Sequence, residues 1–237
     1  MIGDFTPVVE LPSLLSTPGE GRVRRAISII ADGGMVVVVD DDTRENEGDL
    51  IAAAGCISPE MIAFMVNHST GIVCAAMGND RADALLLPPM TANNDDPQGT
   101  AFTVSCDAKS CGTGVSASDR TLTLRVLASE QPDPAALRRP GHIFPLRARN
   151  GGVMTRDGHT EAAFDLARLA GQVPIGVLCE LVNSDGSMMR GLQIDRFAHR
   201  FRLLKISVAE LIAWRREHDS SAETNVISRT AVEELQT

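Results

Sequence analysis

The sequence lacks several features that would place it in a broad class of proteins. It has no apolar stretch long enough to span a bilayer, and its N-terminus carries neither a basic region nor a long apolar segment. It has no basic stripe that would neutralise phosphates, and its formal net charge is −9. We therefore expect no membrane partner, no nucleic-acid partner and no secretion signal. A small anionic substrate stays compatible with this charge because it needs only a local cluster of donors.

Cysteine is scarce and irregularly spaced. The five cysteines are an odd number, lack the spacing of zinc ligands, and in several cases lie within apolar runs. They are Cys56, Cys74, Cys106, Cys111 and Cys179. This usage predicts a reduced, cytoplasmic protein whose thiols are mostly buried.

Chain length and local composition predict one folded domain with two tails. Residues 1–20 are rich in Pro, Ser and Gly and have no clear period, so we expect a flexible N-terminal arm. Residues 21–217 have the apolar content of a single domain, and residues 218–237 are expected to form a polar C-terminal tail. We find neither an internal repeat nor a second domain.

Hydrophobic patterning predicts both strands and helices. A helical period covers residues 23–30, a Ser-Pro pair at residue 58 starts another helix, and a capping box at Ser207 begins the last one. Residues 129–139 are expected to form a surface loop, and residues 140–147 a rigid segment between prolines. Apolar runs predict strands over residues 35–39, 50–54, 72–77, 101–105, 175–182 and 203–206.

The most unusual segment is the acidic stretch, residues 40–49. It carries six carboxylates and one arginine, and it directly follows the β-branched run of residues 35–39. Because like charges packed this closely repel one another, a hard divalent cation or a polyhydroxylated substrate would offset the cost. Oxygen ligands suit Mg²⁺ or Mn²⁺. The alternative is a solvated surface turn, so the residue types favour a site without proving it.

A second candidate is the segment from Arg156 to Thr160. Thr160 is a suitable helix N-cap, and Gly158 permits close backbone approach. A helix N-terminus attracts phosphate, and Arg156 adds a bidentate donor. His159 lies beside this anion site and is a candidate metal ligand. An ordinary capped helix with an exposed histidine is the alternative.

Two further titratable residues have less specific surroundings. Glu180 lies within an apolar strand pattern, where burial would raise its pKa and suit it to acid–base chemistry. Strand alternation also permits a position on the solvent side. His142 is held between prolines and is either an acid–base group or a satisfied loop histidine. The residue types together support a metal-assisted enzyme that acts on a small phosphorylated, polyhydroxylated compound.

Several segments resemble a known family when they are taken together. In this sequence they are Asp41–Leu50, Gly114–Arg120, Arg139–Leu146, Gly158–Ala162 and Cys179–Met188. They occur in the order found in 3,4-dihydroxy-2-butanone 4-phosphate synthases of riboflavin biosynthesis, and the resemblance covers roughly residues 20–216. The Arg-Glu-Asn-Glu-Gly-Asp string at residues 44–49 is its most specific part.

The resemblance implies a fold, a reaction and a set of site residues. It implies a single α+β domain with a mixed β-sheet and helices packed around it, a homodimer with sites near the subunit interface, and the conversion of D-ribulose 5-phosphate to 3,4-dihydroxy-2-butanone 4-phosphate and formate. It implies Mg²⁺ or Mn²⁺ held by Glu45 and His159, with His142 and Glu180 as catalytic residues. The implied substrate contacts are Arg44, Glu45, Asp49, Arg156, Asp157, Gly158, His159, Thr160 and Glu180.

The chain departs from the family pattern at three places: Gly112, the pair Asn67-His68 and the pair Arg200-Phe201. None of these positions belongs to the implied metal or phosphate residues. Because no zinc-type cysteine cluster follows Trp214, we expect a monofunctional protein. Two alternatives stay open: a metal-dependent sugar-phosphate isomerase or aldolase that uses the same enediol step, and a catalytically silent sugar-phosphate-binding protein.

Overall fold

The computed structural model describes residues 19–41 and 43–219. The arm predicted for residues 1–20 and the tail predicted for residues 218–237 lie almost wholly outside them. Gly19 and Glu20 already belong to the first helix, and the last helix runs over residues 208–219. Asp42, within the acidic stretch, is also outside the described residues.

One mixed sheet of seven strands organises the described part of the chain, in the order β4-β5-β3-β6-β2-β1-β7. The pairs β1–β7 and β3–β5 are parallel, and the other neighbours are antiparallel. The strands are β1 (Met35–Val39), β2 (Gly48–Ala53), β3 (Cys74–Met77), β4 (Cys106–Ala108), β5 (Leu137–Arg147), β6 (Ile175–Glu180) and β7 (Lys205–Ser207). This mixed sheet confirms the predicted α+β class.

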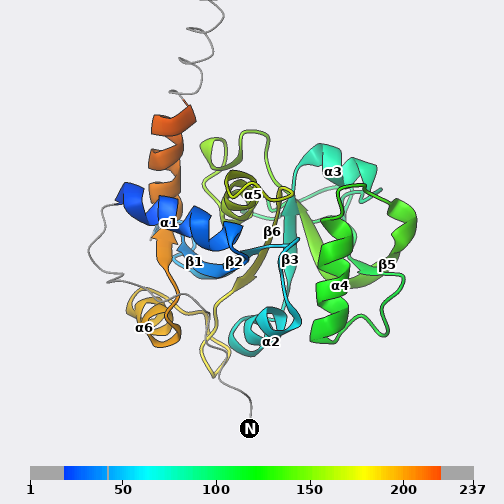
Figure 1. Ribbon diagram of the computed structural model, residues 1–237, viewed down its shortest axis with the longest axis horizontal. Helices are drawn as coiled ribbons and strands as arrows, with labels where there is room; N and C mark the ends of the chain where they lie inside the picture. Colours follow the sequence, from blue (N-terminus) through cyan, green and yellow to red (C-terminus); the bar gives the residue numbers. More distant parts are fainter. Residues whose placement is uncertain (1–18, 42, 220–237) are drawn as a thin grey trace, which may run out of the picture.

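Helices cover both faces of the sheet. In Figure 1, α1 and α5 lie in the upper part of the view, α2 and α6 along the lower edge, and α4 on the right. The helices are α1 (Gly19–Ala31), α2 (Pro59–His68), α3 (Asn79–Ala84), α4 (Ala117–Leu127), α5 (His159–Leu169) and α6 (Leu192–Phe201), with 3₁₀ turns η1 (Pro134–Ala136) and η2 (Gly152–Met154). Among the residues described, no helix has the length and apolar content needed to cross a membrane.

Strand β2 shows how the C-terminal end of the acidic stretch is held in place. All six of its residues are buried, because Leu50 and Ala52 face the core under α2 and α4 while Ile51 packs into the core under α1 and α5. A short apolar run with no polar face is the pattern of a strand covered on both sides. Asp49 therefore leaves this strand at a fixed position, directly opposite Glu180 on β6.

Two predicted segments differ in the structure. Residues 137–139, expected in a loop, begin the long strand β5, and residues 101–105 make only isolated bridges, so β4 starts later at Cys106. The prolines at 140 and 145 argued against a strand, because proline cannot donate to a ladder. Pro140 falls within a register shift, because Cys106 pairs with Ile143 and Asp107 with Arg138, so that residues 139–142 form a bulge in β5. A Cβ on Gly141 would lie 2.1 Å from the Cys106 carbonyl carbon, so glycine is required there.

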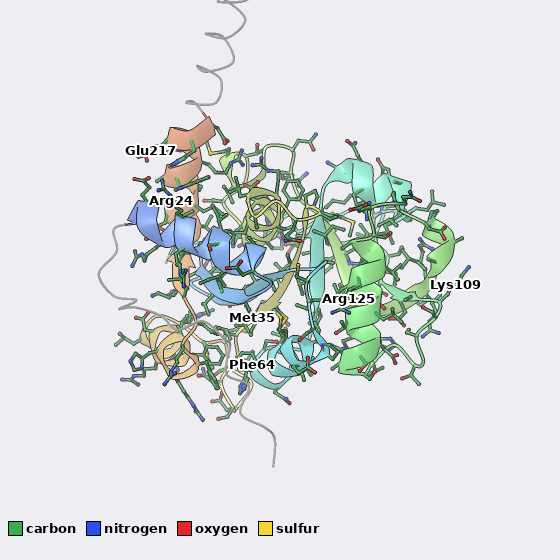
Figure 2. All side chains as sticks on the ribbon, in the orientation of Figure 1. Arg24, Met35, Phe64, Lys109, Arg125 and Glu217 are labelled. Atoms are coloured by element: carbon green, nitrogen blue, oxygen red, sulfur yellow. The ribbon has the colours of Figure 1, made fainter. Side chains whose placement is uncertain are left out.

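Aromatic rings of α6 contact Phe64 and His68 of α2, and Phe64 is labelled in Figure 2. The Phe64 ring lies 5.0 Å from Phe201 and 6.1 Å from Phe197, and His68 stacks 4.8 Å from Phe201. Two of the departures from the family pattern, His68 and Phe201, thus pack against each other. Helix α6 in turn covers the acidic stretch, since a Cβ on Gly48 would lie 3.0 Å from an Ile194 methyl carbon.

Candidate active site

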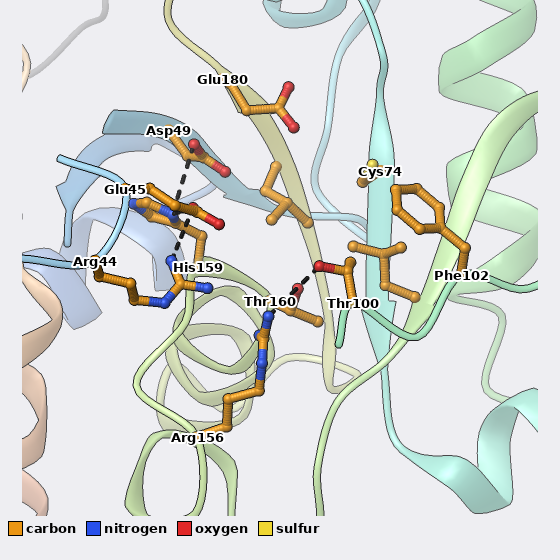
Figure 3. Close-up of a pocket in the computed structure, with 12 residues that line it drawn as sticks. Arg44, Glu45, Asp49, Cys74, Thr100, Phe102, Arg156, His159, Thr160 and Glu180 are labelled. Atoms are coloured by element: carbon orange, nitrogen blue, oxygen red, sulfur yellow. Dashed lines mark hydrogen bonds and ion pairs between the residues drawn. The ribbon is translucent and has the colours of Figure 1, made fainter. Parts of the chain in front are cut away.

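A cavity of about 180 Å³ lies where the ends of β2 and β6 meet the start of α5 (Figure 3). Seven of the predicted site residues line it: Arg44, Glu45, Asp49, Arg156, His159, Thr160 and Glu180. Asp157 is exposed and does not line it, and Gly158 contributes only backbone. His142 lies elsewhere. The cavity thus brings together three separate sequence segments, as the resemblance implied.

Asp40 folds the acidic stretch around its own carboxylate. Its side chain is fully buried, and its Oδ2 accepts hydrogen bonds from Arg44 Nη1 at 2.9 Å and from the Glu45 backbone N–H at 3.0 Å. Its Oδ1 accepts from the Glu47 backbone N–H at 2.9 Å. All of these hydrogen bonds come from residues of the acidic stretch itself. Asp40 therefore shapes the turn that presents Glu45.

Glu45, Asp49 and His159 form a group with unused polar atoms. His159 Nδ1 lies 3.7 Å from Glu45 Oε2 and 3.9 Å from Asp49 Oδ1. His159 Nε2 and Asp49 Oδ1 are buried and have no hydrogen-bond partner. Together with Asp40, the donor atoms of Glu45 and His159 lie within 4.8 Å of one another. Buried polar groups are rarely left unpaired, so this group fits a hard divalent cation with oxygen and imidazole ligands.

The electrostatics of the group follow from its burial. Burial raises the pKa of Asp49 to about 7, with Glu180 and Glu45 adding to the effect and His159 opposing it. Burial alone would lower the pKa of His159, but Asp49 and Glu45 together outweigh it and raise this pKa to about 9. The metal-free group therefore holds protons that a bound cation would displace.

The start of α5 is suited to an anion. Its N-cap is Gly158, so the predicted N-cap role of Thr160 is wrong: the helix begins two residues earlier, and Thr160 lines the cavity. A Cβ on Gly158 would lie 2.3 Å from Arg156 Nη1 and 3.1 Å from Arg44 Nη2. Two guanidinium groups thus converge on a helix N-terminus, an arrangement typical of phosphate sites. His159 is buried, which excludes the exposed histidine considered from sequence.

Arg156 is held by residues that the sequence did not point to. It pairs with Glu161 at 2.6 Å, donates to the Gln98 carbonyl at 3.0 Å, and lies 3.5 Å from Thr100 Oγ1. The polar loop before residue 100 therefore closes one side of the cavity. Cavity-lining residues that sequence reasoning missed as site residues are Cys74, Thr100, Phe102, Leu146 and Leu178. They carry no local motif, and only the folded chain brings them together.

The strand pattern allowed Glu180 to be either buried or on the solvent side, and its observed position is intermediate between these two. Glu180 ends β6, it is half-buried, and it lines the cavity. Its Oε2 accepts a hydrogen bond from Thr70 Oγ1 at 2.6 Å. It is therefore accessible to a ligand and fixed in direction.

His142 lies outside this cavity. It is on β5, its side chain is 43% exposed, and its ring contacts Asp107 rather than any cavity residue. Within one copy of the chain, the structure brings Glu180 to the cavity and leaves His142 on the surface.

Comparisons with known proteins agree on one family. The family model for 3,4-dihydroxy-2-butanone 4-phosphate synthase matches residues 24–214. A protein of that name from Agrobacterium fabrum is 51% identical over 194 residues, which cover 81% of this chain and 91% of that protein. The riboflavin biosynthesis protein RibBA of Salinispora arenicola is 52% identical over 204 residues, covering 86% of this chain and 49% of RibBA. The chain spans about half the length of RibBA and its like.

Solved structures give the same result. A crystal structure described as 3,4-dihydroxy-2-butanone 4-phosphate synthase in complex with two magnesium ions has a TM-score of 0.80 and 44% identity, covering 83% of this chain and 97% of that one. A cation-free structure of the same enzyme name has a TM-score of 0.77 and 42% identity. The chain belongs to the 3,4-dihydroxy-2-butanone 4-phosphate synthase family.

Proposed function

We propose that this protein converts D-ribulose 5-phosphate into 3,4-dihydroxy-2-butanone 4-phosphate and formate in riboflavin biosynthesis. Membership of the family supports this reaction, and the strongest structural support is one observation in the cavity. His159 Nε2 and Asp49 Oδ1 are buried without partners beside Glu45. The same cavity holds two arginines at a helix N-terminus, so it combines a cation site with a phosphate site.

We infer that Glu45 and His159 hold Mg²⁺ or Mn²⁺. A carboxylate oxygen and an imidazole nitrogen suit either ion, and a family member binds two magnesium ions. When bound, the cation supplies charge that stabilises an enediolate formed from the sugar. Asp40 keeps its bonds to the loop and so positions Glu45.

We propose one orientation for the substrate in the cavity. Its phosphate would lie at the residues from Arg156 to Thr160, where free backbone N–H groups and the guanidinium group converge. Its hydroxyl groups would then face Arg44, Asp49 and Glu180 at the other side of the cavity. Asp157 lies outside the cavity and contributes to the phosphate site through the backbone of the turn at most.

Glu180 and His142 are proposed to share the proton transfers. The reaction passes through an enediol, loses water, rearranges its carbon skeleton and releases one carbon as formate, so several protons must move in sequence. One group cannot serve all of them from one position. Glu180 is on the cavity wall, and Asp49 beside it offers a second carboxylate.

A homodimer would bring His142 to the cavity. In one copy, the His142 side chain is 43% exposed, and two apolar residues, Ile72 and Val115, are exposed as well. Val115 follows Gly114, where a Cβ would lie 2.7 Å from His142 Nδ1. Arg120 links the segments of Ile72 and Val115, because it donates to the carbonyls of Gly71 and Val115. We propose that this face meets a second copy in a two-fold contact and supplies His142 to the partner subunit's cavity.

Mixing two inactive variants tests the shared site. His142→Asn and Glu180→Gln, each inactive alone, would recover about a quarter of wild-type activity after subunit exchange, because half of the dimers are mixed and one site in each is intact. No recovery, with exchange confirmed by native mass spectrometry, would place both residues in one subunit's site. The five free cysteines support a cytoplasmic location, which fractionation would check.

Product analysis tests the function itself. With D-ribulose 5-phosphate and Mg²⁺, the protein should release one formate per substrate. Glu180→Gln should abolish this release while the far-ultraviolet circular dichroism spectrum stays unchanged. An isomerised pentose phosphate without formate would instead show an isomerase, and binding without turnover would show a silent sugar-phosphate-binding protein.

A further inference from the structure

Asp107 is a buried carboxylate outside the cavity that the proposed reaction does not use directly. It lies on β4, its side chain is 2% exposed, and it is directed at His142 on β5. Its Oδ1 accepts the His142 backbone N–H at 2.8 Å, and its Oδ2 lies 3.0 Å from His142 Nδ1. One carboxylate therefore contacts both the backbone and the ring of the same histidine.

The neighbouring residues leave room for the contact between Asp107 and His142. The register shift between Cys106 and Asp107 turns the carboxylate towards the 141–142 peptide. Gly114 has φ +88°, and a Cβ there would lie 2.1 Å from Asp107 Oδ2 and 2.7 Å from His142 Nδ1. Any larger residue would displace the pair. Arg138 Nη2 lies 3.4 Å from Asp107 Oδ2 and offsets part of the cost of burying the charge.

The contacts fix which ring nitrogen of His142 carries the proton. An ionised carboxylate only accepts hydrogen bonds, so Nδ1 must donate to Asp107 Oδ2. In the neutral ring, Nε2 is then left without a proton, and the contact with Asp107 is made by the other ring nitrogen. The ring is 43% exposed, so Nε2 is available to a ligand that approaches from outside the chain.

We propose that Asp107 is a positioning residue for His142: it holds the ring in the Nδ1–H tautomer and so makes Nε2 the basic atom. This inference rests on the proposed function for its catalytic meaning, but not for its structural content. Asp107 touches no substrate in this account and acts only through His142.

Substituting Asp107→Asn reverses the tautomer without changing the shape of the side chain. The His142 backbone N–H can only donate, so the new amide must turn its oxygen to it and its NH₂ to the ring. Nδ1 must then accept, and the proton moves to Nε2. A ring with its proton on Nε2 cannot act there as a base, which in a well-studied histidine–aspartate pair lowers turnover by about 10⁴-fold.

Nitrogen NMR of histidine-labelled protein measures the tautomer directly. The chain has five histidines, so the spectrum is small, and His142→Asn assigns the signal. We expect Nδ1–H in the wild type and Nε2–H in Asp107→Asn, at a pH where the ring is neutral. Ser105→Ala is the matched control: Ser105 Oγ accepts the Gly141 N–H at 3.1 Å in the same turn, and its removal should leave the tautomer unchanged.

Formate release supplies the second measurement. Asp107→Asn should lower turnover by at least about 100-fold with little change in KM, and Asp107→Glu should recover much of it, because a carboxylate is restored. An Nε2–H tautomer in the wild type, or turnover of Asp107→Asn within twofold of the wild type, would overturn the inference. If Asp107→Asn does not fold, the wild-type and Asp107→Glu tautomers still decide it. If the wild type releases no formate, the proposed function fails while the tautomer measurement stands by itself.

Discussion

Two buried aspartates at the ends of the acidic stretch differ in what they contact. Asp40 is surrounded by donors: the Arg44 guanidinium and two backbone N–H groups satisfy both of its oxygens. Asp49 is equally buried, but its Oδ1 has no partner and its pKa is raised to about 7, chiefly by burial. The first aspartate holds the structure together, and the second is left for a ligand. The same residue type thus does two different things nine positions apart.

Asp49→Asn should separate activity from stability most strongly. We expect turnover to fall by about 10³-fold or more, because removing a preorganised charge from a water-poor site costs several kcal/mol of transition-state stabilisation. The free energy of unfolding should change by less than about 1 kcal/mol, since no hydrogen bond is lost. Formate release and urea denaturation measure the two quantities. A variant that unfolds easily yet keeps its turnover would reverse the roles assigned to the two aspartates.

Glu45→Ala should weaken Mg²⁺ binding by about 100-fold, because a hard cation loses a charged oxygen ligand. Asp41→Ala is the matched control: it removes the same charge from the same loop, but the Asp41 side chain is exposed and accepts its hydrogen bonds from Thr43. Isothermal titration calorimetry compares the two variants. Equal losses would show that the loop attracts the ion through its overall charge and has no specific ligand.

Asp40→Asn should cost about 1–3 kcal/mol of unfolding free energy, because a buried amide cannot satisfy the Arg44 guanidinium and both backbone donors. Urea denaturation at fixed Mg²⁺ concentration measures the loss. If Asp40→Asn were as stable as Asp49→Asn, the distinction between a structural and a ligand-binding aspartate would not hold.

The pH dependence of stability tests the Asp49–His159 pair without a substitution. Both pKa values in the pair are raised above their ordinary values, Asp49 from 3.8 to about 7 and His159 from 6.5 to about 9. The folded, metal-free protein thus binds more protons than the unfolded chain, and it should lose stability of the order of a few kcal/mol as the pH rises from 6 to 9.

Mg²⁺ should reduce this slope, because the cation replaces the protons. Melting temperatures at pH 6 and pH 9, with and without Mg²⁺, check the prediction, and His159→Asn should flatten the curve. A metal-free protein that gains stability towards pH 9 would show that the pair does not hold extra protons.

The sequence predicted those parts of the cavity whose residues lie in a recognisable local pattern. The sequence placed Asp49 just before one apolar strand and Glu180 within another, but only the fold shows that these strands are neighbours and that the two residues lie opposite each other. The helix start near His159 also followed from a local pattern, but Thr160 was wrongly assigned as its N-cap, because glycine and threonine are both common caps and only the backbone decides between them.

Other parts of the site had no sequence signal. Strand β5 was missed because its two prolines argue against a strand, and a bulge in β5 at residues 139–142 interrupts its pairing with β4. Thr100 reaches Arg156 from 56 positions away, and Asp107 reaches His142 across that bulge. Contacts of this kind depend on register, which local propensity does not encode. The position of His142 outside the cavity also depends on the whole fold.

Formate release before and after Mg²⁺ is added to chelator-treated protein tests the central claim most directly. We expect no formate from D-ribulose 5-phosphate in the chelator and full release once Mg²⁺ is restored. Asp41→Ala should behave as the wild type, and Glu45→Ala should need far more Mg²⁺ for the same rate. Formate release at an undiminished rate in the chelator, or a restored protein that converts the sugar without formate, would contradict the central claim.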